Sequence, residues 1–190
     1  MTRARNLADF NAAGVLTSTS TLNPANLDDT GTIPSALLAG VGGGEDNAPY
    51  FLTTGSTNQN ILDATMVTVA YDTLLDSLDS ATGFNTSSYT YTIQSGGAGL
   101  WSFSAGTYFG QITNGSQYDI AFYINGVNQA QSRAVAGGAH QANPQATQLF
   151  KMEEGDTICV KLYQNTGSTR VAQTGDRSSF FGGYRVKEIA

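Results

Sequence analysis

The sequence predicts an all-β fold, a sandwich of short strands, and three observations support it. Charged residues make up only 13% of the chain, and the deficit is filled by small and polar residues, among them 22 glycines. From Pro49 onward, hydrophobic and polar residues alternate with the period of strands that have one buried face. Turn residues such as Gly96-Gly97 and Gly137-Gly138 separate these segments, as in β-sandwiches and barrels.

Taken in chain order, the first short predicted strand covers residues 66–70. Asn125-Gly126 follows a later alternating run, and an Asn-Gly pair between strands favours a tight hairpin because both residues accept positive φ. The hydrophobic residues expected to share a face are Tyr89, Tyr91 and Ile93; Trp101 and Phe103; Tyr118, Ile120, Phe122 and Ile124; and Ile158, Val160 and Leu162, with Asp119, Ala121, Tyr123, Cys159, Lys161 and Tyr163 on the opposite faces.

Two blocks near the C-terminus complete the pattern. Residues 149–163 indicate a strand end, a tight turn at 154–156 and an alternating strand, and residues 178–186 indicate a closing strand. Within the closing strand, Phe180, Phe181 and Tyr184 are too close in sequence for all of them to point into one core. At least one of them is therefore expected to face solvent or another subunit.

The first 45 residues differ from the rest. A short helix is predicted over residues 3–13, and a threonine- and serine-rich stretch and the glycine-rich joint 40–44 follow. Hydrophobic residues are too scattered here to form a core, so they would be ordered only by lying on another protein. We expect residues 1–45 to be a docking leader, with a plain linker as the alternative, and residues 46–190 to be the knob domain. The expected docking residues are Leu7, Phe10, Val15, Leu16, Leu22, Leu27 and Ile33.

Composition argues against several functional classes. The net charge is −6, and no cluster of lysine and arginine is present to neutralise phosphates, so we expect no nucleic-acid partner. No apolar run is long enough to predict membrane insertion, and the N-terminus lacks the apolar region of a secretory signal peptide. The single cysteine excludes a disulfide within the chain.

Candidate catalytic residues are few. His140 lies in a predicted loop without an obvious nucleophile, so a solvated histidine is favoured over a general base. Cys159 lies within a strand, which favours a structural thiol over a reactive one. Asp156 and Asp119 are expected to serve turn and surface roles. We therefore expect a protein that is not an enzyme and uses no cofactor; hydrolysis of a surface polysaccharide is the remaining enzymatic hypothesis.

One acidic cluster bears on metal binding. If the segment were helical, Asp72, Asp76 and Asp79 would share a face that suits calcium. The regular spacing of a calcium loop is absent, so a solvated acidic loop is favoured and no metal is predicted, with a calcium site as the alternative.

Three long polar segments are candidate binding loops, namely residues 111–117, 134–145 and 165–177. Loops at the ends of a rigid sandwich carry function more often than the strands do. Tyrosine, asparagine and glutamine side chains there suit stacking on sugars and hydrogen bonding to them. Plain solvated loops are the alternative for each segment.

Several segments in the same order resemble the globular-head family of complement component 1q, a relative of tumour necrosis factor. Residues 98–103 resemble its Ala-Gly-x-Tyr-x-Phe motif, although Leu100 and Trp101 depart from it, and residues 179–184 resemble its Phe-x-Gly-Tyr ending. The other similar segments are 49–51, 66–73, 84–91, 118–126 and 149–163.

The resemblance implies a ten-stranded jelly roll that assembles as a tight homotrimer. Nine tyrosines and nine phenylalanines are more than one small sandwich needs inside, and a subunit interface would accommodate the excess. Phe181 or Tyr184 is expected to contribute to that interface, with surface exposure as the alternative. The complete set of expected interface residues is Phe180, Phe181, Tyr184, Tyr163 and Tyr123.

The departures from animal members of that family point to a different setting. The chain has no collagen-like Gly-X-Y run, and its leader is similar to those of bacteriophage fibre and head-decoration proteins. We therefore expect a trimeric virion protein, made in the host cytoplasm, whose leader binds other virion proteins and whose knob contacts a host surface glycan or protein. The alternative is a soluble bacterial module that recognises carbohydrate or protein.

Overall fold

The knob is an all-β sandwich in this computed structural model, which describes residues 49–77, 83–137, 141–175 and 179–188. The described residues contain no helix, and the prediction of an all-β fold is confirmed. The described ranges contain thirteen strands, where the resemblance implied ten. They are β1 Tyr50–Thr54, β2 Gln59–Ile61, β3 Val67–Thr68, β4 Thr73–Ser77, β5 Phe84–Asn85, β6 Thr90–Thr92, β7 Gly99–Gly106, β8 Gln117–Ile124, β9 Val127–Val135, β10 Gln145–Met152, β11 Thr157–Gln164, β12 Arg170–Ala172 and β13 Phe180–Glu188.

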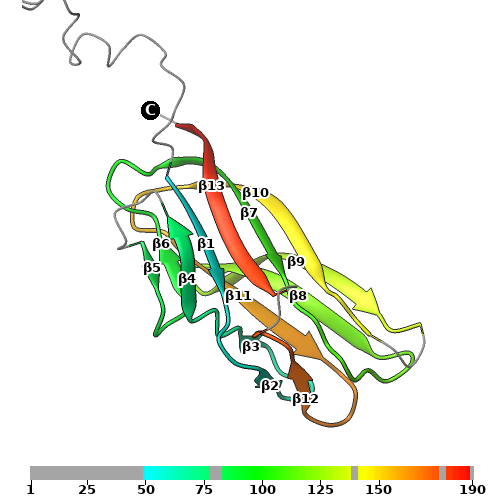
Figure 1. The fold of residues 1–190 in the computed structure, drawn as a ribbon. Helices are drawn as coiled ribbons and strands as arrows, with labels where there is room; N and C mark the ends of the chain where they lie inside the picture. Colours follow the sequence, from blue (N-terminus) through cyan, green and yellow to red (C-terminus); the bar gives the residue numbers. More distant parts are fainter. Residues whose placement is uncertain (1–48, 78–82, 138–140, 176–178, 189–190) are drawn as a thin grey trace, which may run out of the picture. The chain divides into compact units, whose positions relative to one another are not determined.

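Two antiparallel sheets form the sandwich (Figure 1). The five-stranded sheet has the order β10-β7-β13-β1-β4. The six-stranded sheet has the order β5-β6-β11-β8-β9, with β3 paired beside β11. A separate two-stranded ribbon, β12-β2, and strand β3 are the short additions that the resemblance did not predict.

Aromatic rings from both sheets fill the space between them. Phe51 of β1 stacks on Tyr91 of β6 with ring centroids 4.1 Å apart, and Phe181 packs edge-to-face on Phe51 with centroids 4.9 Å apart. Trp101 and Phe103 of β7 stack on each other at 5.6 Å. Such pairs contribute about 0.5–1.5 kcal/mol beyond the apolar area that they bury. The alternation in the sequence thus places the large aromatic rings on the inward faces of the strands, where they form one core.

Strand β13 uses a glycine to leave room for that core. A Cβ at Gly183 would lie 2.4 Å from the Phe103 ring, a distance that real Cβ atoms do not reach. The missing side chain lets Phe103 fill the space above β13. Closure of the sandwich therefore depends on this glycine as well as on the phenylalanine.

The predicted hairpin and strand faces are confirmed where β8, β9 and β11 meet. Asn125 and Gly126 have φ values of 50° and 80° in the turn between β8 and β9. The side chains of Ile120, Phe122 and Leu162 are fully buried in the core, as alternation predicted. Strand β3 covers only two residues of the segment 66–70, which is a correction to its predicted length.

The predicted helix over residues 3–13 and all the expected docking residues lie outside the described residues. Within the described ranges, no helix is long and apolar enough to span a bilayer.

Candidate binding surfaces

The outward face of the five-stranded sheet presents a patch that we call the apolar face. The pairing register places Leu52 beside Gly182 and Gly182 beside Ser104, so the middle of the face is made of small side chains. Larger hydrophobic side chains surround this flat centre. They are Leu52, Leu75, Leu149, Phe180 and Tyr184.

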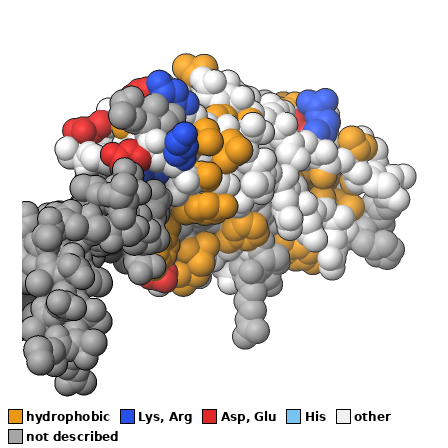
Figure 2. Space-filling model, turned by 90° about the horizontal axis from the view of Figure 1, so that it is seen from above, with side chains coloured by type: hydrophobic (Ala, Val, Ile, Leu, Met, Phe, Trp, Pro, Cys, Tyr) orange, Lys and Arg blue, Asp and Glu red, His pale blue; other side chains and the backbone are white. Residues whose placement is uncertain are grey.

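These hydrophobic side chains are more exposed than a core would allow. The exposed fractions are 57% for Leu75, 51% for Leu149 and 55% for Tyr184. Figure 2 looks onto the molecule from above Figure 1 and shows hydrophobic side chains gathered across that view. A contiguous exposed apolar patch on a soluble domain marks an interaction surface more often than isolated exposed leucines do.

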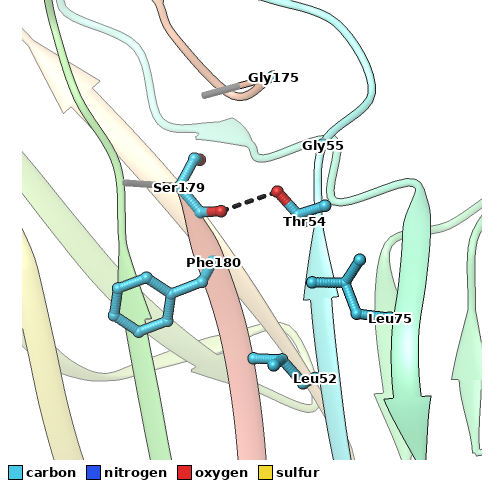
Figure 3. A pocket seen from close by; sticks show the side chains of 7 residues that line it. All are labelled: Leu52, Thr54, Gly55, Leu75, Gly175, Ser179 and Phe180. Atoms are coloured by element: carbon cyan, nitrogen blue, oxygen red, sulfur yellow. Dashed lines mark hydrogen bonds between the residues drawn. The ribbon is translucent and has the colours of Figure 1, made fainter. Parts of the chain in front are cut away.

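A hollow of about 490 Å³ lies at one end of the apolar face (Figure 3). Its edge is held by the hydroxyl of Thr54, which donates to the backbone carbonyl of Ser179 at 2.8 Å and joins β1 to the segment that precedes β13. The hollow offers a place where a protruding side chain of a partner can insert. Its lining residues are Leu52, Thr54, Gly55, Leu75, Gly175, Ser179 and Phe180.

The residues expected at a subunit interface lie in three different places. Phe180 and Tyr184 belong to the apolar face. Phe181 is fully buried in the core of its own chain and has no surface left for another subunit, so that expectation is corrected. Tyr123 and Tyr163 lie on the outward face of the six-stranded sheet, away from the apolar face.

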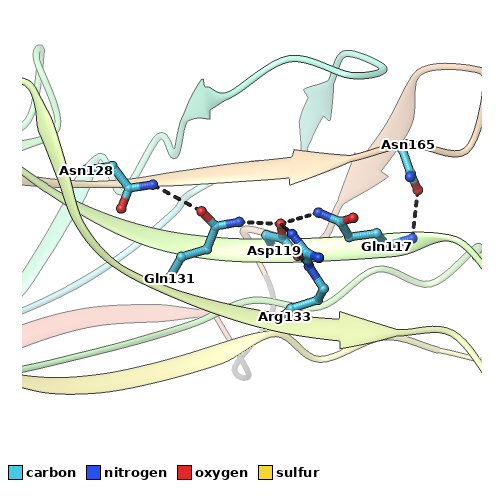
Figure 4. Close-up of polar contacts among 6 residues, drawn as sticks. All are labelled: Gln117, Asp119, Asn128, Gln131, Arg133 and Asn165. Atoms are coloured by element: carbon cyan, nitrogen blue, oxygen red, sulfur yellow. Dashed lines mark hydrogen bonds and ion pairs between the residues drawn. The ribbon is translucent and has the colours of Figure 1, made fainter.

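That second outward face is organised around the carboxylate of Asp119 on β8 (Figure 4). The side chain is fully buried although it points away from the core. It accepts hydrogen bonds from the side-chain amides of Gln117 and Gln131 and from the guanidinium of Arg133, with Nε at 3.1 Å and Nη2 at 3.3 Å. We call Gln117, Asp119, Gln131 and Arg133 the Asp119 network. A surface role for Asp119 was expected, and its complete burial is a correction.

Further contacts orient the members of the network. Asn128 donates to the side-chain oxygen of Gln131 at 3.0 Å, which turns the amide nitrogen of Gln131 toward Asp119. Asn165, just beyond β11, accepts from the backbone N–H of Gln117 at 2.7 Å. The network is thus fixed from β8, β9 and the loop after β11.

Strand β11 adds Tyr163 and Lys161 to the same face. Tyr163 is paired opposite Asp119, and Lys161 is paired opposite Ala121. The Lys161 ammonium lies 4.3 Å from the centroid of the Tyr123 ring, within the range of a cation–π interaction. This face therefore combines half-buried tyrosines with two cationic side chains.

The three candidate binding loops meet at one end of the sandwich. Arg170 donates to the hydroxyl of Thr113 at 2.7 Å and so joins the loop 165–177 to the loop 111–117. The backbone N–H of Ala136 donates to Ser116 at 2.9 Å, which adds the segment 134–145. The segment 165–177 is also more structured than expected, because it contains β12.

The residues considered for catalysis or metal binding do not form a centre within the described ranges. Asp72 accepts two hydrogen bonds from Ser56 at 2.6 Å, and Asp76 accepts from Tyr50 at 3.2 Å. Asp76 lies in strand β4 and Asp72 directly precedes it, so the helical arrangement considered for calcium is wrong. Asp79 and His140 lie outside the described residues.

Cys159 and Asp156 have structural surroundings. Burial raises the pKa of the Cys159 thiol, and the nearby Lys161 ammonium only partly opposes that rise. The predicted turn role of Asp156 is confirmed, because its carboxylate accepts from the backbone N–H of Glu153 at 2.8 Å and from the side chain of Asn125 at 2.7 Å.

Comparison with known proteins is informative at the level of the fold. No family model matches the sequence, and no curated protein matches it. The structure is similar to the globular domain of zebrafish complement 1qA protein, with a TM-score of 0.54 and 11% identity over 74% of this chain and 99% of that one. Murine APRIL gives 0.54 and 11% over 73% and 99%, and Eiger TNF from S. frugiperda gives 0.51 and 9% over 75% and 94%. The chain thus has the jelly-roll fold of the complement 1q and tumour necrosis factor structures.

Proposed function

We propose that this chain is a non-enzymatic, homotrimeric knob of a phage virion, anchored through residues 1–45 and displayed for contact with a host surface. The observation that carries the proposal is the apolar face. Its exposed Leu52, Leu75, Leu149 and Tyr184 are costly to leave in water, and association with another copy removes them from it.

A threefold arrangement agrees with the shape of this surface. In a closed ring each subunit offers two different surfaces, and one surface of each copy covers the other surface of its neighbour. The hollow beside Phe180 gives the apolar face a place where a protruding side chain of the neighbouring copy can insert. The trimer that the sequence resemblance implies is therefore the assembly that we propose.

Sedimentation equilibrium of the full chain and of residues 46–190 tests the assembly. We expect both to have three times the mass of one chain at micromolar concentration, because the proposed contact lies within the knob. A stable single subunit in both would overturn the proposed assembly.

Phage particles assembled with a leader-deleted protein test the virion role. The shortened knob should remain trimeric and be missing from purified particles. If it stays on the particles, the docking role of residues 1–45 is wrong. A full-length trimer that never associates with particles would instead favour a soluble bacterial recognition module.

A further inference from the structure

The Asp119 network raises a question that its structural role alone does not answer. A carboxylate on the outward face of a sheet is ordinarily solvated at no cost, whereas Asp119 is fully buried and needs compensating partners. The surrounding side chains supply four hydrogen bonds to it, two from amides and two from Arg133. The arrangement fixes the position of one arginine far more firmly than an ordinary surface ion pair would.

The exposed side of the Arg133 guanidinium is available to bind a ligand. Arg133 uses Nε and Nη2 on Asp119, while its side chain remains 55% exposed. Within the described residues no partner is found for Nη1. The guanidinium is planar, so an N–H of Nη1 and the second N–H of Nη2 lie parallel along its free edge. That edge can donate two parallel hydrogen bonds to a carboxylate.

Tyrosines and a lysine lie around this fork. Tyr163, Asp119 and Arg133 are aligned across three neighbouring strands, so the Cβ atoms of the tyrosine and the arginine are about 10 Å apart. Lys161 and Tyr123 continue the same face, one and two rows along the strands. A tyrosine ring offers an apolar surface with a polar end, which suits the mixed surface of a sugar ring.

We propose that the outward face of β8, β9 and β11 binds an acidic sugar. Its carboxylate would take the free edge of Arg133, and its ring would lie against Tyr163. This inference deepens the proposed function by naming the class of host-surface ligand, and it rests on that function for its biological setting only.

The composition of the face favours this ligand over other anions. Two cations are too few for the phosphate backbone of a nucleic acid, and the net charge of −6 opposes a polyanion. A free inorganic anion would gain nothing from the tyrosines. A sugar that carries a single carboxylate uses both the guanidinium edge and the aromatic surface.

Saturation-transfer NMR and calorimetry on the full chain test the proposal. The probes are an oligosaccharide that carries one glucuronic acid, the same oligosaccharide with that carboxyl reduced to an alcohol, and inorganic phosphate. We expect binding of the acidic oligosaccharide at least tenfold tighter than that of the reduced one. Phosphate should bind no better than the reduced sugar.

Variants locate the site. Arg133→Lys keeps one positive charge but loses the planar fork, and Tyr163→Ala removes the ring; each should weaken the acidic sugar about tenfold or more. Lys151→Gln removes one charge from the other sheet and should leave affinity unchanged. Arg133→Lys also disturbs a buried carboxylate. The double variant Asp119→Asn with Arg133→Gln removes both charges, so its thermal unfolding and its sugar binding are measured in parallel as a folded reference.

The outcomes separate this inference from the proposed function. Equal binding of the acidic and reduced sugars, equal binding of phosphate, or unchanged affinity in Arg133→Lys and Tyr163→Ala would each overturn the acidic-sugar site. Sedimentation of the same samples reports assembly independently. A trimer that binds no acidic sugar removes the inference alone, and a monomer that binds it removes the trimer alone.

Discussion

The two outward faces of the sandwich follow from the same strand alternation and have opposite chemistry. On the five-stranded sheet, exposed leucines and Tyr184 surround a floor of glycine and serine. On the six-stranded sheet, the corresponding surface is occupied by the Asp119 network, Lys161 and two tyrosines. The first face has apolar area that water disfavours, and its polar side chains, such as Ser104 and Thr147, hydrogen-bond to each other. The second has oriented hydrogen-bonding groups beside the exposed Val135.

This difference assigns the two faces different roles, subunit contact for the first and ligand binding for the second. Apolar area supports large, weakly directional contacts such as those between subunits, whereas oriented donors select a particular ligand. A single sandwich can hold both because its two sheets isolate the faces from each other.

A charge on the apolar face should have the largest effect. Leu52→Glu places a carboxylate beside the hollow, and its desolvation should weaken self-association by more than about 100-fold. Sedimentation equilibrium measures the change. Val171→Glu, at an exposed valine of β12, is the control and should leave the assembly intact. If both variants remain trimeric, the apolar face is not the contact surface.

Loss of the arginine should come next, through stability. Arg133→Ala leaves Asp119 buried with two amide donors only, and we expect a cost of about 2 kcal/mol in the free energy of unfolding after allowance for the exposure of the arginine. Denaturant unfolding of a monomeric background such as Leu52→Glu measures it. The double variant Asp119→Asn with Arg133→Ala should recover part of the loss. A cost that is not reduced in the double variant would mean that the ion pair is not its source.

Cysteine labelling compares the faces directly. Burial raises the pKa of Cys159, so its thiolate fraction at pH 8 should be lower than that of a free cysteine and its reaction with a disulfide reagent several-fold slower. The reaction should accelerate as the pH rises toward the raised pKa. Leu149→Cys, made with Cys159→Ser, should react rapidly in a monomeric variant and slowly in the trimer. Equal rates in both states would place residue 149 outside the interface.

The smallest effect is expected at the cation–π contact. Lys161→Gln should cost about 0.5 kcal/mol of stability, because the ammonium over Tyr123 lies at a half-exposed position. Lys161→Arg should retain most of that contribution. The denaturant midpoints of Lys161→Gln and Lys161→Arg, measured side by side, test this difference. A loss of stability in Lys161→Gln as large as that of Arg133→Ala would show that the two cations are coupled.

Much of the fold was readable from local pattern. Period-two alternation identified the inward residues of β8 and β11, and Asn125-Gly126 identified the turn between β8 and β9. Both signals act over a few residues, through the pleat of a strand and through tolerance of positive φ, so they need no knowledge of distant partners. The jelly-roll resemblance also rested on such short segments in order.

Phe181 and the acidic segment show where local pattern fails. Adjacent Phe180 and Phe181 must face opposite sides of β13, but the sequence does not say which of them faces the core. Pairing with β1 and β7 decides it, since Phe181 lies opposite Thr53 and Ala105. The spacing of Asp72 and Asp76 is compatible with a helix in isolation, and pairing with β1 makes the residues that follow Asp72 a strand.

The Asp119 network is the clearest case of what the chain alone could not reveal. The Asn125-Gly126 turn pairs Ile124 with Val127, and an unbroken ladder from there would bring Ser132 opposite Asp119. A bulge between Phe122 and Tyr123 shifts the register by one residue, so that Arg133 takes that place instead. The sequence by itself therefore determined an alternating sandwich with a hairpin at residues 125–126. Only the paired sheet, through its bulge, decided which side chain meets the carboxylate.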